Sequence, residues 1–205
     1  MLLSRLALDI TKRATMIALQ NPAMFHGAIE RAFEPRSSRT LWRIDVLHRQ
    51  HYLLLLSEEE PNLAAFIEQF GTGEAAETRS YDSLLERIED GSTWQFRLCA
   101  NPTYSKTKPN GRGTVCAHST VEHQCRWLKE QAQKHGFALA DDAFTVVHSQ
   151  WYTFGKSTGD KVKLLSVTYE GLLSVTDAKA FREALTQGIG RGKAYGMGLM
   201  TLIRR

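Results

Sequence analysis

The sequence has few cysteines and no long apolar segment. Its three cysteines are Cys99, Cys116 and Cys125, an odd number without CxxC spacing, which argues against a disulfide framework. The opening MLLSRLALDITKR lacks the long apolar core of a secretion signal, and nowhere do about 18 apolar residues follow one another as a membrane span requires. We therefore expect a soluble protein with no membrane partner that is not exported and works in a reducing cytoplasm.

The sequence also lacks a mononucleotide-binding loop, although it contains the glycine-rich stretch GIGRGKAYGMG from Gly188 to Gly198. A Walker A loop has four residues between its first glycine and GK, and then Ser or Thr. Here Gly188 and Gly192 enclose three residues, and Ala194 follows GK. The dinucleotide fingerprint requires a following helix, but GLMTLIRR is typical of a strand. No nucleotide cofactor is therefore expected, and the stretch is either a flexible turn or a phosphate-contacting loop formed by Gly188, Gly190, Arg191, Gly192 and Lys193.

Charge is distributed unequally along the chain. Residues 1–90 hold 10 Lys and Arg against 14 Asp and Glu, whereas residues 91–205 hold 16 against 8. The second half is therefore the candidate surface for a polyanion. The alternative is that these basic side chains are simply solvated.

The first half contains one clear amphipathic helix, NPAMFHGAIERAF. Asn21 can cap this helix, and Pro22 suits its first turn. Its apolar residues recur at helical spacing and form one continuous stripe of Phe25, Ala28, Ile29, Ala32 and Phe33.

The alternation in LWRIDVLH predicts a strand with one buried face. Trp42, Ile44 and Val46 form its apolar side, and Arg43 and Asp45 form its polar side. LLSRLAL and HYLLLLS also predict strands, PNLAAFIEQF predicts a helix, and ETRSYDSLLERI is the weakest segment, where a last strand is expected. TKRATMIALQ gives no definite prediction. Residues 1–90 therefore follow the order β-α-β-β-α-β.

Residues 91–205 repeat this order. WQFRLCA, FTVVHSQWYTF, VKLLSVTYEGLLSVT and GLMTLIRR predict strands, and residues 177–187 predict a helix. TVEHQCRWLKEQAQKHG predicts a helix that ends at Gly136 and carries on one side Val121, Cys125, Leu128 and Ala132. NPTYSKTKPNGRG is expected to be a mobile loop. Together the halves predict an α+β protein with tandem ferredoxin-like domains, residues 1–90 and 91–205, an RRM-like sheet architecture shared with many single-strand RNA binders.

His26 is the first candidate for chemistry. It borders the apolar stripe, one helical turn before Glu30, so its ring should emerge at the edge of the core. The near-neutral pKa of a histidine side chain suits proton transfer at physiological pH. The alternative is a boundary histidine that only packs its ring.

A metal site is the second candidate. Cys116, His118, His123 and Cys125 form a C-x-H-x4-H-x-C array, and these side chains can ligate zinc. The spacing is not that of a standard zinc finger, and His123 and Cys125 lie two residues apart on a predicted helix, facing roughly opposite sides. We therefore expect no metal site.

Basic and aromatic residues are interleaved in the second half, a combination that suits RNA because aromatic rings stack on bases and cations bind phosphates. Trp94 and Phe96 precede one arginine, and Trp151 and Tyr152 precede the hairpin GKSTGD. Burial in the core is the alternative for Phe96 and Trp151. The candidate RNA-binding cations are Arg97, Lys106, Lys108, Arg112, Lys156, Lys161 and Lys163.

Four segments resemble the CasE family, the CRISPR-associated endoribonuclease of the type I-E Cascade complex. They are MLLSRLALD, NPAMFHGAIERAF, FRLCANPTYSK, which is similar to the family's FRLRANPxK, and GIGRGKAYGMGLMTL, which is similar to its glycine-rich signature. They occur in this order over essentially the whole chain, and the combination is specific although each segment alone is weak. The resemblance implies two ferredoxin-like domains and metal-independent cleavage of CRISPR repeat RNA at the base of its hairpin. It also implies that the enzyme stays bound to its product and joins the other Cascade subunits.

The resemblance assigns the catalytic role to His26. It implies that His26 helps to move the proton between the attacking ribose 2′-OH and the 5′-oxygen leaving group, as base or as acid. The products are then a 2′,3′-cyclic phosphate, or its opened 3′-phosphate, and a 5′-OH end. The glycine-rich loop is implied to contact the RNA backbone or to pack near His26, and the GKSTGD hairpin to grip the RNA. Because His26 lies in the acidic half, we expect the site at the junction of the two domains.

Two residues depart from the family. Some members carry a catalytic tyrosine at the position of Ala23, so a lysine or another hydroxyl would have to replace it. Cys99 stands where FRLRANP has its second arginine, which removes one planar cation from a phosphate contact. Two alternatives to a CRISPR endoribonuclease follow: an RNA-binding structural subunit without useful catalysis, favoured by Ala23, and a zinc-dependent nuclease.

Overall fold

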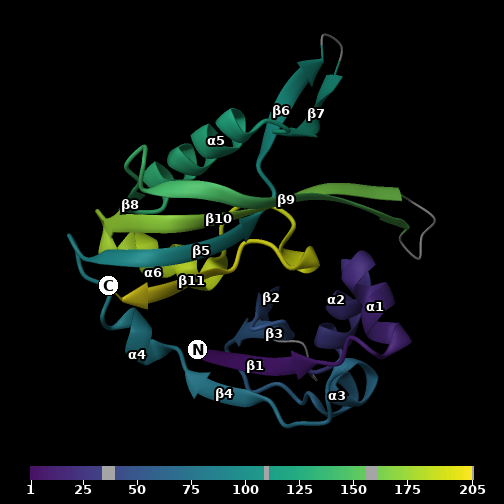
Figure 1. The fold of residues 1–205 in the computed structure, drawn as a ribbon. Coiled ribbons are helices and arrows are strands. Elements are labelled where there is room, and N and C mark those ends of the chain that lie inside the picture. The colour runs from purple at the N-terminus through teal and green to yellow at the C-terminus, as the bar shows by residue number, and fades with distance from the viewer. Residues whose placement is uncertain (34–39, 109–110, 156–160, 205) are drawn as a thin grey trace.

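A computed structural model describes residues 1–33, 40–108, 111–155 and 161–204 of the chain. Its strands form two large antiparallel sheets and a separate two-stranded hairpin (Figure 1). The first sheet has the order β2-β3-β1-β4, and the second has the order β11-β5-β10, with β9 and the short β8 both paired to β10. Both orders are those of a ferredoxin-like unit, so the predicted tandem ferredoxin-like α+β fold is confirmed.

The first sheet and its helices come from the first half of the chain. The elements are β1 (Leu2–Leu8), α1 (Arg13–Gln20), α2 (Pro22–Glu30), β2 (Leu41–Leu47), β3 (Gln50–Ser57), α3 (Ala64–Phe70), β4 (Glu77–Ser80) and α4 (Asp82–Leu85). The segment TKRATMIALQ, which gave no definite prediction, is mostly α1, and its buried side includes Thr15 and Ala18. Phe25, Phe66 and Phe70 of α2 and α3 pack their rings together beneath this sheet, with centroids 5.0–5.9 Å apart.

The second sheet and its helices come from the second half. The elements are β5 (Thr93–Ala100), β6 (Thr103–Lys108), β7 (Gly111–Ala117), α5 (Val121–Lys134), β8 (Phe137–Ala138), β9 (Phe144–Gly155), β10 (Lys161–Val175), α6 (Ala178–Gln187), the 3-10 turn η1 (Lys193–Tyr195) and β11 (Met200–Arg204). The long strands β9 and β10 pair from Gly155 and Lys161 to Phe144 and Gly171. The segment expected to be a mobile loop is instead the hairpin β6–β7, which projects from the sheet (Figure 1).

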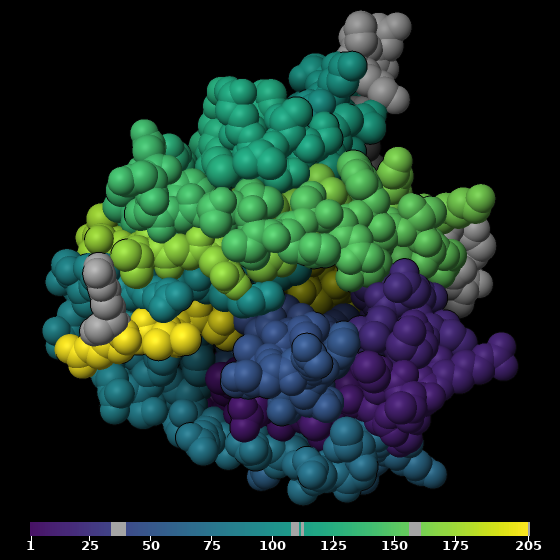
Figure 2. Space-filling model, in the orientation of Figure 1, coloured from purple at the N-terminus to yellow at the C-terminus, as the bar shows by residue number. Residues whose placement is uncertain are grey.

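The two halves share a hydrophobic core. Leu41, Leu56, Tyr81 and Ile88 of the first half are buried in the same cluster as the side chains between β5, β10, α5 and α6 of the second half. Figure 2 shows the halves in contact along a seam across the molecule. Two sheets therefore pack into one body. No helix among the described residues is long and apolar enough to cross a membrane.

Strand β2 differs from the prediction in which side chains it buries. Arg43 and Asp45 are 2% and 6% exposed, whereas Val46, predicted to face the core, is 50% exposed. The prediction assumed that the polar face of β2 meets solvent. That face instead lies against β5 and β11 of the second half, and Arg43 donates hydrogen bonds to both strands.

Helix α5 buries Leu128 and Ala132 as predicted, but Val121 and Cys125 are not among its buried residues. Its buried residues are Gln124, Trp127, Leu128 and Ala132, while Val121 is exposed and Cys125 is half-buried. The Thr120 side chain accepts a hydrogen bond from the backbone N–H of His123 and so caps the helix. Val121 lies in the first turn of the helix and is 58% exposed. The predicted stop at Gly136, where φ is 72°, is confirmed.

Candidate active site

His26 lies on α2 at the border between buried and exposed surface. Asn21 caps the helix by accepting a hydrogen bond from the backbone N–H of Ala23, 3.3 Å away. Phe25 and Ile29 then point into the core, which leaves the His26 side chain 28% exposed at the helix edge. Its Nε2 lies 3.2 Å from Oε1 of Glu30, one turn further along the helix. A partly exposed imidazole beside a carboxylate can exchange a proton with a ligand.

The glycine-rich loop brings a second ring to His26 from the other end of the chain. The rings of His26 and Tyr195 meet edge to face, with centroids 6.4 Å apart and planes at 61°. Tyr195 also meets the ring of Phe154 of β9, with centroids 5.1 Å apart. The sequence did not identify Tyr195 as a site residue. The GKAYG turn carried no signal that it would fold back onto α2.

Glycines allow this loop to pack closely against its neighbours. Gly188, Gly190, Gly192 and Gly196 have φ between 74° and 85°, a region that side chains disfavour. A Cβ on Gly196 would lie 2.8 Å from the Trp42 ring, and a Cβ on Gly188 would lie 2.7 Å from Leu41. The glycines therefore seat the loop on β2, beside α2.

Replacing Gly196 with alanine is expected to lower the free energy of unfolding by more than backbone strain alone. The matched control is Gly91→Ala, because Gly91 has nearly the same φ, 80° against 79°, and open space where its Cβ would be. Gly91→Ala should cost about 1–2 kcal/mol, and Gly196→Ala should cost about 1–3 kcal/mol more because the Cβ displaces Trp42. Chemical denaturation measures both. Equal losses would show that the contact with Trp42 is unimportant.

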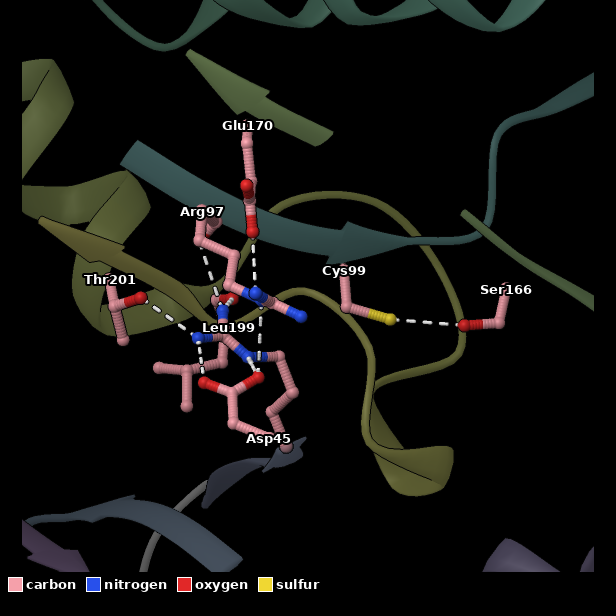
Figure 3. Close-up of polar contacts among 8 residues, drawn as sticks. Asp45, Arg97, Cys99, Ser166, Glu170, Leu199 and Thr201 are labelled. Carbon is pink, nitrogen blue, oxygen red and sulfur yellow. Dashed lines mark hydrogen bonds and ion pairs between the residues drawn. The ribbon is translucent and has the colours of Figure 1, made fainter. Parts of the chain in front are cut away.

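A polar network joins the two halves beside this loop (Figure 3). Arg43 of β2 donates two hydrogen bonds to the Asp45 carboxylate, at 2.8 and 2.6 Å. It also donates to the carbonyl oxygens of Arg97 and Leu199 and to Oγ1 of Thr201, at 2.8–3.0 Å. All five guanidinium N–H groups are thus hydrogen-bonded, and three of the bonds cross to the second half, at β5, at Leu199 and at β11.

Arg97 occupies the same junction. Its guanidinium pairs with Glu170 of β10 and lies 3.3 Å from Oδ1 of Asp45, and the side chain is 36% exposed. Both contacts are internal to the protein and hold the charge of Arg97 within the junction. Its predicted role in RNA binding stays a prediction.

A cavity of about 610 Å³ opens between the two sheets next to this network. Its lining includes polar side chains from both halves and the Tyr195 ring; examples are His51, Arg97, His148, Tyr152, Glu170 and Tyr195. The indole N–H of Trp42, also in the lining, has no hydrogen-bond partner among the described residues. Tyr195 thus both lines this cavity and contacts His26.

Cys99 faces the buried junction. Its Sγ lies 3.0 Å from Oγ of Ser166, and burial raises the pKa of the Cys99 thiol. Cys99 is 8% exposed and belongs to the lining of the cavity, with its side chain directed toward Ser166 (Figure 3).

We expect Cys99 to resist alkylation in the folded protein. Raising the thiol pKa lowers the thiolate fraction, and burial excludes the reagent, so iodoacetamide at pH 8 should modify Cys99 at least about tenfold more slowly than in urea. Half-buried Cys116 is the internal control. Peptide mass spectrometry measures both sites, and modification of Cys99 as fast as Cys116 would contradict its burial.

The remaining predicted cations lie on the two hairpins and the glycine-rich loop. Lys106 is exposed on β6, and Lys161 is exposed at the start of β10. Lys163 places its Nζ 4.7 Å from the centre of the exposed Trp151 ring, a cation–π contact. Lys108 and Arg112 lie in β6 and β7, but their side chains, and the whole of Lys156, are outside the described residues.

In the glycine-rich loop, Arg191 is exposed and Lys193 is half-buried. Arg191 forms an isolated antiparallel bridge with Asn101, at the end of β5. The outer ends of β9 and β10 lie close to α1 and α2 (Figure 1), and the contact of Phe154 with Tyr195 confirms this proximity. The structure thus brings the β9–β10 hairpin and the glycine-rich loop to His26, while the β6–β7 hairpin projects elsewhere.

Two of the four candidate zinc ligands, His118 and His123, have rings that contact each other. His118 lies between Tyr104 and His123, with ring centroids 4.8 and 5.7 Å away. Nδ1 of His123 is 2.6 Å from Oγ1 of Thr120. Burial, and to a lesser extent the nearby His123, lowers the pKa of His118. In the part of the chain that the structure describes, no three His, Cys, Asp or Glu side chains are grouped to hold a metal ion.

Known proteins match this chain, two of them over 98% of its length. The CRISPR-associated endoribonuclease Cse3 of Thermus thermophilus is 27% identical over 219 aligned positions, which cover 98% of this chain and 99% of that protein. The Cascade subunit CasE of Escherichia coli is 27% identical over 124 positions, 57% of this chain and 60% of that protein. A solved structure of Cse3 bound to 19 nt RNA has a TM-score of 0.79 at 23% identity, covers 98% of each chain, and shows the same fold.

These matches confirm the resemblance to CasE that the four sequence segments indicate. The model of the family described as CRISPR associated protein matches residues 1–204. The chain therefore belongs to the family of CRISPR associated proteins.

Proposed function

We propose that this protein is an endoribonuclease that cleaves hairpins of CRISPR repeat RNA and stays bound to the product as a subunit of Cascade. The observation that carries the proposal is the position of His26, partly exposed at the contact of the two halves and flanked by Glu30 and the glycine-rich loop. The full-length relative named CRISPR-associated endoribonuclease supports it. This role places the protein in the cytoplasm.

The proposed reaction needs no metal because its nucleophile belongs to the substrate. The ribose 2′-oxygen attacks the adjacent phosphorus, the O2′–P bond forms, and the P–O5′ bond breaks. The 2′-OH loses its proton and the 5′-oxygen gains one, which leaves a 2′,3′-cyclic phosphate and a 5′-OH. His26 acts at one of these two proton transfers.

Cations of the second half hold the RNA in this proposal. The candidates are Lys106, Lys108 and Arg112 on the β6–β7 hairpin, Lys156, Lys161 and Lys163 on the β9–β10 hairpin, Arg97, and the loop residues Gly188, Gly190, Arg191, Gly192 and Lys193. For the lysines and arginines the reason is charge attraction for phosphates, and for the three glycines it is the close approach of backbone N–H groups. Residues 1–90 and 91–205 act as the two domains, each built around its own sheet.

Cleavage in the presence of a chelator tests the proposal. The purified protein should cut its repeat hairpin at one site in excess EDTA, at a rate within about twofold of that without EDTA. Loss of cleavage in EDTA, restored by Zn²⁺, would contradict the metal-independent mechanism. Tight binding without cleavage would favour the second candidate, a structural RNA-binding subunit, for which Ala23 is the specific observation.

A further inference from the structure

The contact between Tyr195 and His26 has no explanation in the mechanism above. Their rings meet edge to face, 6.4 Å apart, although the residues lie at opposite ends of the chain. We propose that Tyr195 is a positioning residue, whose ring holds the His26 imidazole in the orientation that proton transfer requires. This inference rests on the proposed endoribonuclease function, and the same loop then serves the active site without contacting the reacting atoms.

The backbone around Tyr195 is restrained by a short turn and by the glycines on either side of it. Tyr195 ends the turn η1, and its N–H donates to the carbonyl oxygen of Gly192, 2.8 Å away. Gly192 and Gly196, on either side of the turn, both have left-handed backbones. Gly196 lies against the Trp42 ring, where no side chain fits. Tyr195 is therefore anchored to β2, on the half of the molecule that carries His26.

The Tyr195 ring makes a second aromatic contact, with Phe154 of β9. Phe154, which is buried, meets it edge to face at 5.1 Å. The Tyr195 ring therefore contacts one aromatic ring from each half of the molecule, and both contacts restrict its rotation.

The Tyr195 ring adds an orientational contact to the His26 ring. The His26 ring stands at a helix edge, and the terminal torsion of a histidine side chain has broad minima. Its ion-pair partner Glu30 is itself 31% exposed, and partly exposed pairs at this helical spacing hold side chains weakly. An aromatic contact adds a geometric preference that the ion pair lacks. A misplaced catalytic group is costly, since a shift of about 1 Å can reduce a rate about 100-fold.

Two substitutions distinguish the contribution of the Tyr195 ring to the cleavage rate from that of its hydroxyl group. Under single-turnover conditions with saturating enzyme, Tyr195→Ala should lower the cleavage rate by about 10- to 100-fold. Tyr195→Phe, which keeps the ring, should stay within about twofold of wild type, and both variants should bind uncleavable RNA within about threefold of wild type. If Tyr195→Ala cleaves the RNA at the wild-type rate, the inference is overturned. Equal loss in both variants assigns the effect to the hydroxyl and overturns it too.

A nuclear magnetic resonance measurement tests the contact itself, whether or not RNA is cut. The Cε1–H resonance of His26 should move in Tyr195→Ala, which removes the ring current, and should stay close to wild type in Tyr195→Phe. Tyr104→Ala is the matched control, because Tyr104 stacks on His118 and should move the His118 resonance instead. An unmoved His26 resonance in folded Tyr195→Ala overturns the inference. Failure of wild type to cleave contradicts the proposed function separately.

Discussion

Replacing His26 with alanine is expected to reduce the single-turnover rate of RNA cleavage by about 10²–10⁴-fold, the usual contribution of a general acid or base. RNA affinity should stay within about twofold, because binding is assigned to cations elsewhere and His26 is a single partly exposed side chain. Rate measurements with enzyme in excess, beside an independent binding titration, separate the two effects.

A second histidine provides the control for His26→Ala. His48 is exposed in the turn between β2 and β3 and has φ of 49°. Asparagine tolerates this backbone conformation, so His48→Asn should leave both the fold and the cleavage rate unchanged. Full activity in His26→Ala would refute the assignment of His26 as the catalytic histidine.

The second large effect is expected at Arg43. Arg43→Met should lower the free energy of unfolding by about 3–5 kcal/mol, or the melting temperature by roughly 10 °C for a chain of this size. The substitution keeps apolar volume but removes five hydrogen bonds. Among the described residues, it leaves the buried Asp45 carboxylate with Arg97 alone, and it removes the donor from the carbonyl oxygens of Arg97 in β5 and of Leu199 just before β11.

Arg126→Met is the matched control for Arg43→Met. Arg126 pairs with Glu122 on the surface of α5, and the two side chains are 60% and 76% exposed. Such a pair contributes about 0.2–0.5 kcal/mol, so this variant should unfold almost as wild type does. Calorimetry or urea titration measures both proteins. Similar small losses at the two positions would show that the Arg43 network does not stabilise the junction.

Local patterns in the sequence predicted most of the fold. Helix α2 followed from its cap and apolar stripe, and the two β-α-β-β-α-β units followed from periodicity and turn residues. The β6–β7 hairpin was taken for a loop because its glycines, proline and lysines are typical of loops. Its strands pair with each other outside the two large sheets, so they show little apolar alternation.

The contacts between the halves were not predictable in this way. Arg43 and Asp45 are polar residues on an alternating strand, and alternation cannot show that a second sheet covers the polar face. Tyr195 meets His26 only because the last helix and strand return the chain to α2. His26 itself was identified from the edge of a helical stripe and from the resemblance to CasE. The residues that contact the His26 side chain could be identified only from the structure.

A single deoxynucleotide tests the central claim most directly. Once the cut is mapped on the all-RNA hairpin, the ribose on the 5′ side of the scissile phosphate is replaced with 2′-deoxyribose. The wild-type protein in EDTA should bind this hairpin with unchanged affinity and fail to cut it, while cutting the all-RNA hairpin to a 2′,3′-cyclic phosphate or 3′-phosphate and a 5′-OH. Cleavage of the deoxy-substituted hairpin at the same bond would contradict attack by the ribose 2′-OH.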